Sequence, residues 1–273
     1  MRSTSTARLR SRGRQASDSP AAQALARAGL TARGIIWILI GIVAALVAFG
    51  QARQQADQQG ALQLLARQPL GSVLLWVLGI GFVCYALWCL SQAAFGVAGE
   101  GSGAGPRLKA LCRAVIYSFF AYLTFQVISG AHGSQTHRQQ DVTAKAMQHP
   151  AGRWLIGIVG LIVVIAGLVL VGQGFRRTFL KYLRTWEMSP RTRRVVERLG
   201  VIGTIARGVV IALVGVLVID AAVTHKPSES GGIDKALLTL RNQPLGEFLV
   251  LLAALGLIIF GVYGLCEARW RKV

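Results

Sequence analysis

Long apolar blocks separated by short polar connections make up most of the chain. Each block carries few charges and is long enough to cross a bilayer, which takes roughly 20 residues of helix. The alternative, a soluble all-α bundle, would show narrow apolar stripes on its helices instead of continuous blocks. We therefore predict an all-α, polytopic membrane protein. Its six expected transmembrane helices are residues 30–50, 71–95, 111–130, 153–175, 203–224 and 245–268.

The polar positions within these blocks follow one pattern that occurs three times. An Arg in one block is followed 36 or 37 residues later by Pro-x-Gly, and 59 or 60 residues later by a Gln or Glu in the next block. The Arg residues are Arg33, Arg113 and Arg207, the Pro residues are Pro69, Pro150 and Pro244, and the last positions are Gln92, Gln173 and Glu267. The unit is a two-helix hairpin, so all three copies insert with the same orientation. We predict approximate threefold symmetry about an axis along the membrane normal.

The repeat divides the chain into five parts. These are a disordered basic arm (1–24), hairpin repeat 1 (25–98), hairpin repeat 2 (99–176), a basic amphipathic connection (177–198) and hairpin repeat 3 (199–273). In the connection, Phe179, Tyr182 and Trp186 recur at helical spacing among basic residues, which predicts an amphipathic helix for an anionic membrane surface or for a partner protein. Ser189 and Pro190 then form the start signal of another helix.

Small residues recur at fixed positions of the first helix in each hairpin. One follows the Arg directly (Gly34, Ala114, Gly208), and another comes eight residues after it (Gly41, Ala121, Gly215). Small residues let membrane helices approach closely, so we place these at helix contacts. The segment before each Pro predicts a short amphipathic helix on the outer surface, and the Pro itself is expected at the first turn of the next span.

Composition and charge agree with a membrane protein and give its orientation. Hydrophobic residues make up 53% and charged residues only 15%, against about a quarter in soluble domains. If the N-terminus is cytoplasmic, that side holds 22 of the 30 basic residues and 5 of the 11 acids. This bias predicts that both termini lie in the cytoplasm, at a bacterial inner membrane. The alternative, nucleic-acid binding, lacks any accompanying motif.

The repeated polar residues are the candidate site. All six lie near the cytoplasmic ends of their helices, and a charged residue inside a span should have a partner. We hypothesise a ring of three Arg, each held by the Gln or Glu of its own or a neighbouring unit, that attracts anions. Only Arg207 with Glu267 would form an ion pair. The alternative is that each Arg extends to the lipid headgroups or makes a structural hydrogen bond.

Other chemistry is weakly indicated. Cys84, Cys89, Cys112 and Cys266 are expected as small buried residues and not as a disulfide or metal framework. A loop carries His132, His137, Asp141 and His149, but their spacing fits no compact zinc pattern, so we interpret them as solvated residues. Asp220 is interpreted as a helix-end carboxylate in preference to a proton relay. We predict no catalytic residues, no cofactor and no metal site.

The repeated motifs resemble a family of bacterial membrane proteins, the domain of unknown function 1206 family. They are Ala32-Arg33-Gly34, Gly60-Ala61-Leu62, Gln68-Pro69-Leu70-Gly71 and the pair Tyr85 and Trp88 in repeat 1, and Ala206-Arg207-Gly208, Gln243-Pro244-Leu245-Gly246 and the pair Phe260 and Tyr263 in repeat 3. Repeat 2 departs, with Cys112-Arg113-Ala114 and no aromatic pair. The resemblance implies a multi-pass membrane protein and no established activity.

The sequence is compatible with three classes of function. The sequence favours a non-enzymatic integral membrane protein that acts through lipid or protein contacts, with anionic headgroups at its basic cytoplasmic segments and no nucleic-acid partner. The alternative is a small channel or transporter for a small or anionic solute, with the Arg ring as its selectivity element. An intramembrane enzyme is the least supported class, because no acid pair, His cluster or nucleophile lies at a shared depth.

Overall fold

The computed structural model describes residues 20–50, 57–95, 104–130, 140–145, 152–224 and 232–272, and these residues are almost entirely helical. The helices are α2 (Pro20–Ala48), α3 (Gln58–Ala66), α4 (Gly71–Phe95), α5 (Ala104–Ile128), α7 (Gly152–Phe175), α8 (Pro190–Thr224), α9 (Ile233–Arg241) and α10 (Gly246–Trp270), with two short 3-10 helices, η1 (Thr178–Tyr182) and η2 (Thr185–Glu187). Within the described residues, α2, α4, α5, α7, α8 and α10 are long and apolar enough to cross a membrane. The predicted number of spans and the all-α class are confirmed.

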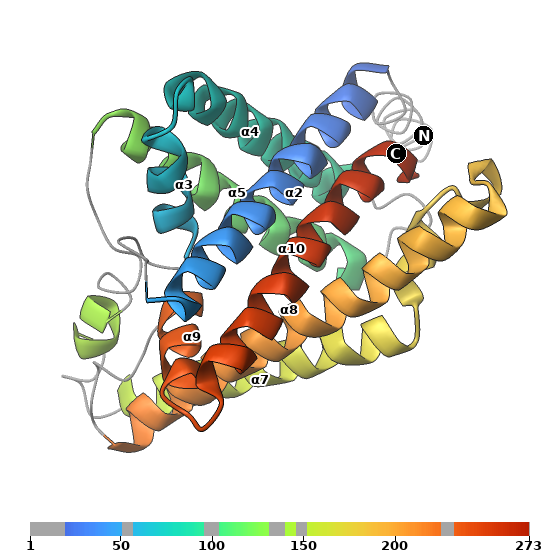
Figure 1. The fold of residues 1–273 in the computed structure, drawn as a ribbon. Helices are drawn as coiled ribbons and strands as arrows, with labels where there is room; N and C mark the ends of the chain where they lie inside the picture. Colours follow the sequence, from blue (N-terminus) through green and yellow to red (C-terminus); the bar gives the residue numbers. More distant parts are fainter. Residues whose placement is uncertain are drawn as a thin grey trace, which may run out of the picture.

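The two ends of the bundle differ. Helix α2 begins and α10 ends on the same side, which we call the terminal end, whereas α3 and α9 lie at the opposite side, the far end (Figure 1). Two predicted boundaries move. Residues 20–24, assigned above to the arm, are the first residues of α2, and the rest of the arm lies outside the described residues. The fifth span continues without a break into the helix predicted at Pro190, which gives α8 a length of 35 residues.

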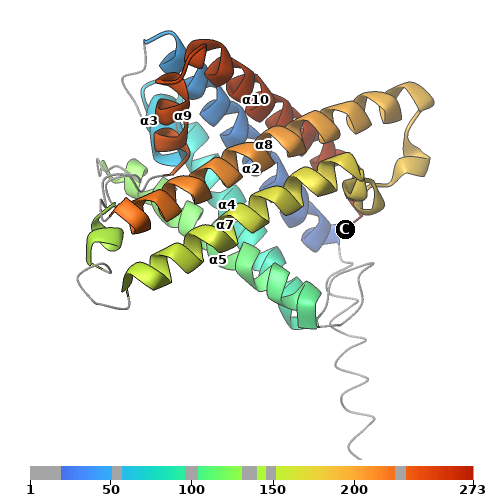
Figure 2. The ribbon, with the colours of Figure 1, turned by 90° about the horizontal axis from the view of Figure 1, so that it is seen from below.

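The first helix of each repeat packs most extensively against the second helix of another repeat. Helix α2 packs on α10, α5 on α4 and α8 on α7, and both views show α10 beside α2 and α7 beside α8 (Figures 1 and 2). The contacts inside a hairpin, between α2 and α4 and between α8 and α10, are smaller. The three interfaces between repeats therefore hold the bundle together, and we call them the seams.

Small residues line two of the three seams, α2–α10 and α7–α8, at equivalent positions of the repeat. A Cβ atom added to Gly34 would lie 2.9 Å from the Gly261 carbonyl oxygen, and one added to Gly208 would lie 2.8 Å from that of Gly167. The same close approach recurs about two turns away in two further pairs, Gly41 with Ala254 and Gly215 with Gly160. The prediction that small residues mark helix contacts is confirmed for these positions.

Repeat 2 departs from the other two inside its hairpin. In repeat 3, a Cβ atom on Gly256 would lie 2.2 Å from the Cβ atom of Ala206, and repeat 1 has the equivalent close pair Gly81 and Ala32. Repeat 2 has Ile162 and Cys112 at these positions, and both are exposed. Helices α5 and α7 are not among the closely packed pairs of the described residues. The threefold symmetry is approximate because repeat 2 lacks the small residues that close the hairpin.

The Pro-Leu-Gly turns differ from the prediction in one respect. Helices α4 and α10 begin at Gly71 and Gly246, so Pro69 and Pro244 lie in the turns and not in the first helical turn. In each turn the Leu between the Pro and the Gly has a left-handed backbone, with φ of 64° at Leu70 and 60° at Leu245. The short helices expected before these turns are α3 and α9, whereas Pro150 of repeat 2 lies outside the described residues.

The connection after α7 is not the predicted amphipathic helix. Residues 178–187 form η1 and η2, and the chain between them pairs with the end of α10 through a β-bridge from Leu183 to Arg271. The Arg184 amide donates to the Trp270 carbonyl over 2.7 Å, and the Lys272 amide donates to the Tyr182 carbonyl over 2.9 Å. Pairing with the chain end satisfies backbone groups that a surface helix would have satisfied within itself.

Candidate functional site

A buried carboxylate organises the terminal end of the bundle. Glu267 lies in the last turn of α10 and is 6% exposed. It accepts hydrogen bonds from Arg33 of α2, across the α2–α10 seam, and from Arg271, four residues further along its own chain. One carboxylate thus pairs with two guanidinium groups, and the pair Arg33 and Glu267 joins repeat 1 to repeat 3.

Arg207 occupies the equivalent of the Arg33 position on α8 and is held differently. Its guanidinium carbon lies 4.9 Å from the centre of the Trp37 ring and 4.8 Å from that of Phe260. Its Nε atom is buried without a hydrogen-bond partner among the described residues. Aromatic faces attract a cation but do not cancel its charge. The expected ion pair of Arg207 with Glu267 is wrong, because Glu267 pairs with Arg33 and Arg271.

Arg271 was missed in the sequence because it follows the last span. Its guanidinium carbon lies 5.3 Å from the centre of the Trp88 ring and 5.6 Å from that of Tyr182. It is buried, and its position one helical turn after Glu267 is the signal that could have identified it. We call Arg33, Arg207, Arg271 and Glu267 the arginine cluster.

The other members of the predicted ring take part unequally. Gln92 is 7% exposed, and its Oε1 atom has no hydrogen-bond partner among the described residues. Arg113 is half-buried and lies close enough to Glu267 and Cys89 for electrostatic interaction. Gln173 is exposed. The structure therefore brings together part of the ring and does not make it symmetric.

Aromatic side chains surround the cluster. Trp37 and Phe260 pack edge to face with ring centres 5.4 Å apart, and Tyr85 and Tyr117 do the same at 4.4 Å. The Tyr85 hydroxyl is fully buried and has no hydrogen-bond partner among the described residues, as is also true of the Arg33 Nε atom. Three buried groups that can donate a hydrogen bond therefore lie in one aromatic-lined region with an excess of positive charge.

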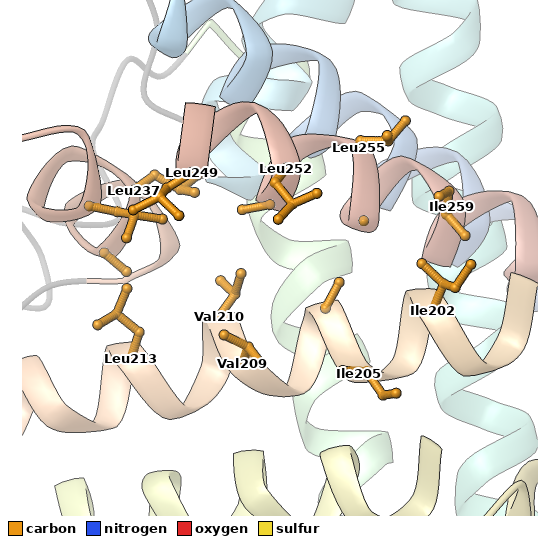
Figure 3. A pocket seen from close by; sticks show the side chains of 15 residues that line it. Ile202, Ile205, Val209, Val210, Leu213, Leu237, Leu249, Leu252, Leu255 and Ile259 are labelled. Atoms are coloured by element: carbon orange, nitrogen blue, oxygen red, sulfur yellow. The ribbon is translucent and has the colours of Figure 1, made fainter. Parts of the chain in front are cut away.

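An apolar groove is the second candidate site. It has a volume of about 570 Å³, lies between α8 and α10 and is bounded by α9 at the far end (Figure 3). Its lining includes Ile202, Val209, Leu213, Leu252 and Ile259 and contains no polar side chain. The sequence carries no signal for this groove, because its residues have the same apolar character as other lipid-facing positions.

Among the residues that the structure describes, the remaining predicted positions form no further site. Within the described residues, no group of three or more His, Cys, Asp and Glu could hold a metal ion, and His132, His137 and His149 lie outside them. Asp141 and Asp220 are exposed. Cys89 is buried as expected, whereas Cys112 is exposed on α5. The polar residues outside the arginine cluster that are buried include Asp57 and Asp234, at the starts of α3 and α9.

The fold, with its three repeated hairpins of long apolar helices, defines a multi-pass membrane protein. The model of the family described as Domain of Unknown Function (DUF1206) matches three times, over residues 28–96, 108–177 and 202–271, and the chain belongs to this family. It is 32% identical over 250 residues, 90% of each chain, to "Uncharacterized protein YxxB" of Bacillus subtilis (strain 168). No solved structure matches the chain. The resemblance seen in the sequence is confirmed.

Proposed function

We propose that the protein is a non-enzymatic membrane protein that binds a small anion in the arginine cluster. The observation that carries this proposal is the charge of the cluster, which contains three guanidinium groups and one carboxylate, with Arg207 outside the ion pairs that Glu267 forms. Charges buried within membrane-spanning segments are costly unless they are paired. A small anion would offset the charge of Arg207 and accept hydrogen bonds from the free donors of Arg33, Arg207 and Tyr85. The proposal assigns no bond-making step to these residues.

We further propose that the terminal end faces the cytoplasm of a bacterial inner membrane. The basic residues support this orientation, because 22 of 30 then lie on the cytoplasmic side. The anion would enter from that side, since the cluster lies near the ends of α10 and the 3-10 helices. Selection would depend on size, because aromatic rings enclose the guanidinium groups.

Thermal unfolding of the detergent-purified protein in different sodium salts at constant ionic strength tests the proposal. The probes are phosphate, sulfate, acetate and chloride, with bulky gluconate as the reference anion. A bound anion at about one hundred times its Kd stabilises the folded state by about 2.7 kcal/mol. We expect one or more of the small anions to raise the unfolding temperature of the wild type and to have no such effect on Arg207→Gln.

Arg193→Gln is the matched control, because Arg193 is an exposed residue of the same helix. It should respond to the anion as the wild type does. The proposal is overturned if no small anion raises the unfolding temperature above the gluconate reference, or if Arg207→Gln responds like the control. Anion flux into liposomes then separates a channel or transporter, which conducts, from a protein that only binds.

A further inference from the structure

The groove between α8 and α10 opens onto the lateral surface of the bundle. Among its lining residues, Ile202, Val209 and Leu252 are each about half exposed, whereas Val210 and Leu237 are buried at its floor and its far end. All lining residues on α8 and α10 belong to membrane-spanning segments. The groove therefore faces the lipid phase, where an aqueous solute has no access.

Its lining suits an acyl chain. The lining of α8 runs from Ile202 to Leu213, which is about 17 Å along a helix. No side chain of the lining is polar, so an occupant that carries polar groups would find no hydrogen-bond partner there. An acyl chain is narrow, apolar and already present in the lipid phase, so it matches the chemistry of this groove.

Basic residues continue the same face of α8 beyond the groove. Arg194, Arg198, Ile202, Ile205 and Val209 follow one another at intervals of three or four residues, so they share one helix face. Helix α8 is 35 residues long, about 52 Å, and therefore extends well past a hydrocarbon core of about 30 Å. Its first turns therefore lie at headgroup level at the terminal end, and Arg198 lies one turn before Ile202, the first residue of α8 that lines the groove.

The two basic side chains are available to an anionic headgroup. Arg194 and Arg198 are exposed, and within the described residues neither forms an ion pair, although Arg194 Nε donates to the Pro190 carbonyl. The neighbouring Glu197 pairs with Arg177 of the connection, 2.5 Å away. A guanidinium group at this depth matches a lipid phosphate in charge and geometry.

We propose that the groove is a specific site for an anionic phospholipid of the leaflet at the terminal end. One acyl chain lies between α8 and α10, and the phosphate binds Arg198 with support from Arg194. This inference is independent of the proposed anion site, because Arg207 does not line the groove. Arg207→Gln should leave lipid binding unchanged, so each proposal can fail without the other.

Native mass spectrometry of the delipidated full-length protein, titrated with phosphatidylglycerol or phosphatidylcholine, tests the site. We expect the wild type to bind its first phosphatidylglycerol more tightly than phosphatidylcholine. Arg198→Gln should weaken phosphatidylglycerol about fivefold and leave phosphatidylcholine unchanged, since one basic residue near an anionic surface contributes about 1 kcal/mol. Val209→Phe should fill the groove and weaken both lipids, and Leu252→Phe on the opposite wall should do the same.

The chain offers matched controls for both kinds of variant. Val169 of α7 is as exposed as Val209 but lies outside the groove, and Arg193 is exposed on another face of α8. Val169→Phe and Arg193→Gln should bind both lipids as the wild type does. The proposal is overturned if the two lipids bind the wild type equally. It also fails if Val209→Phe and Leu252→Phe bind like Val169→Phe, or if the preference for phosphatidylglycerol survives in the double variant Arg194→Gln, Arg198→Gln.

Discussion

At the scale of single residues, one carboxylate makes the environments of the three repeated arginines different. Glu267 stands where the other repeats have Gln92 and Gln173, so only one seam can contain an ion pair at this position. Arg33 forms an ion pair with Glu267, whereas Arg207 contacts the aromatic rings of Trp37 and Phe260. Removing one partner of a buried pair costs about 3–5 kcal/mol, because the remaining charge stays buried. The asymmetry that makes Arg207 a candidate anion ligand therefore originates in one Glu.

A second buried carboxylate gives the protein a predictable dependence on pH. Asp57 caps α3, where its side chain accepts a hydrogen bond from the Gly60 amide over 2.8 Å. Burial and the nearby Asp234 carboxylate raise the pKa of Asp57 from 3.8 to about 6. Because the folded protein favours the protonated acid, its stabilising contribution is complete below about pH 3.8 and is lost as the pH rises through about 6.

Asp57→Asn should remove this dependence. The amide keeps a capping oxygen for Gly60 but cannot ionise. Above pH 6 the variant should be more stable than the wild type by up to about 3 kcal/mol, and near pH 4 the difference should disappear. Thermal unfolding in detergent from pH 4 to pH 8 measures this, with Asp141→Asn, a change at an exposed acid, as the control. A constant difference between variant and wild type at all pH values would contradict it.

At the scale of elements, the sequence predicted what is local and missed what depends on the rest of the chain. The six apolar blocks were sufficient to predict the six long helices. Ser189 and Pro190 were sufficient to predict the start of α8, where Ser189 Oγ accepts a hydrogen bond from the Thr192 amide, as an N-cap residue does. The connection 178–187 was predicted as a helix from its aromatic spacing. Its backbone instead pairs with the end of α10, a contact between segments far apart in the sequence. Periodicity carries no information about such pairing.

The Pro-Leu-Gly turn allows a prediction at this scale. A Cβ atom at Gly246 would lie 2.0 Å from the Arg241 carbonyl oxygen, whereas one at Gly105, also in the first turn of a helix, would meet nothing within 4 Å. Gly246→Ala should therefore lower the unfolding temperature by several degrees, and Gly105→Ala should not lower it. Leu245→Gly should relieve the left-handed strain of Leu and raise the unfolding temperature slightly. Equal effects of the two Gly→Ala changes would contradict the role of the turn.

At the scale of the whole molecule, the repeats form a ring that the last helix closes onto the first. Gly34 with Gly261 joins α2 to α10 in the same way as Gly208 with Gly167 joins α8 to α7. The ion pair of Arg33 with Glu267 is added at the α2–α10 seam alone. The repeat identifies the six candidate positions but not which neighbour each one contacts, because a repeat does not specify the order of its copies around the axis. The partners of Arg33 and Arg207 followed only from this closure.

Closure makes the covalent link between repeats 1 and 2 dispensable for assembly. A fragment of residues 1–98 would meet the rest of the chain through two seams, α2 with α10 and α4 with α5. Co-expressed fragments 1–98 and 99–273 should therefore copurify from membranes. Gly34→Leu should abolish this, because its side chain would collide with the Gly261 carbonyl, whereas Gly172→Leu should not, because a Cβ atom there meets nothing within 4 Å. If the wild-type fragments fail to associate, or if Gly34→Leu copurifies as well as Gly172→Leu, the seams do not hold the bundle together.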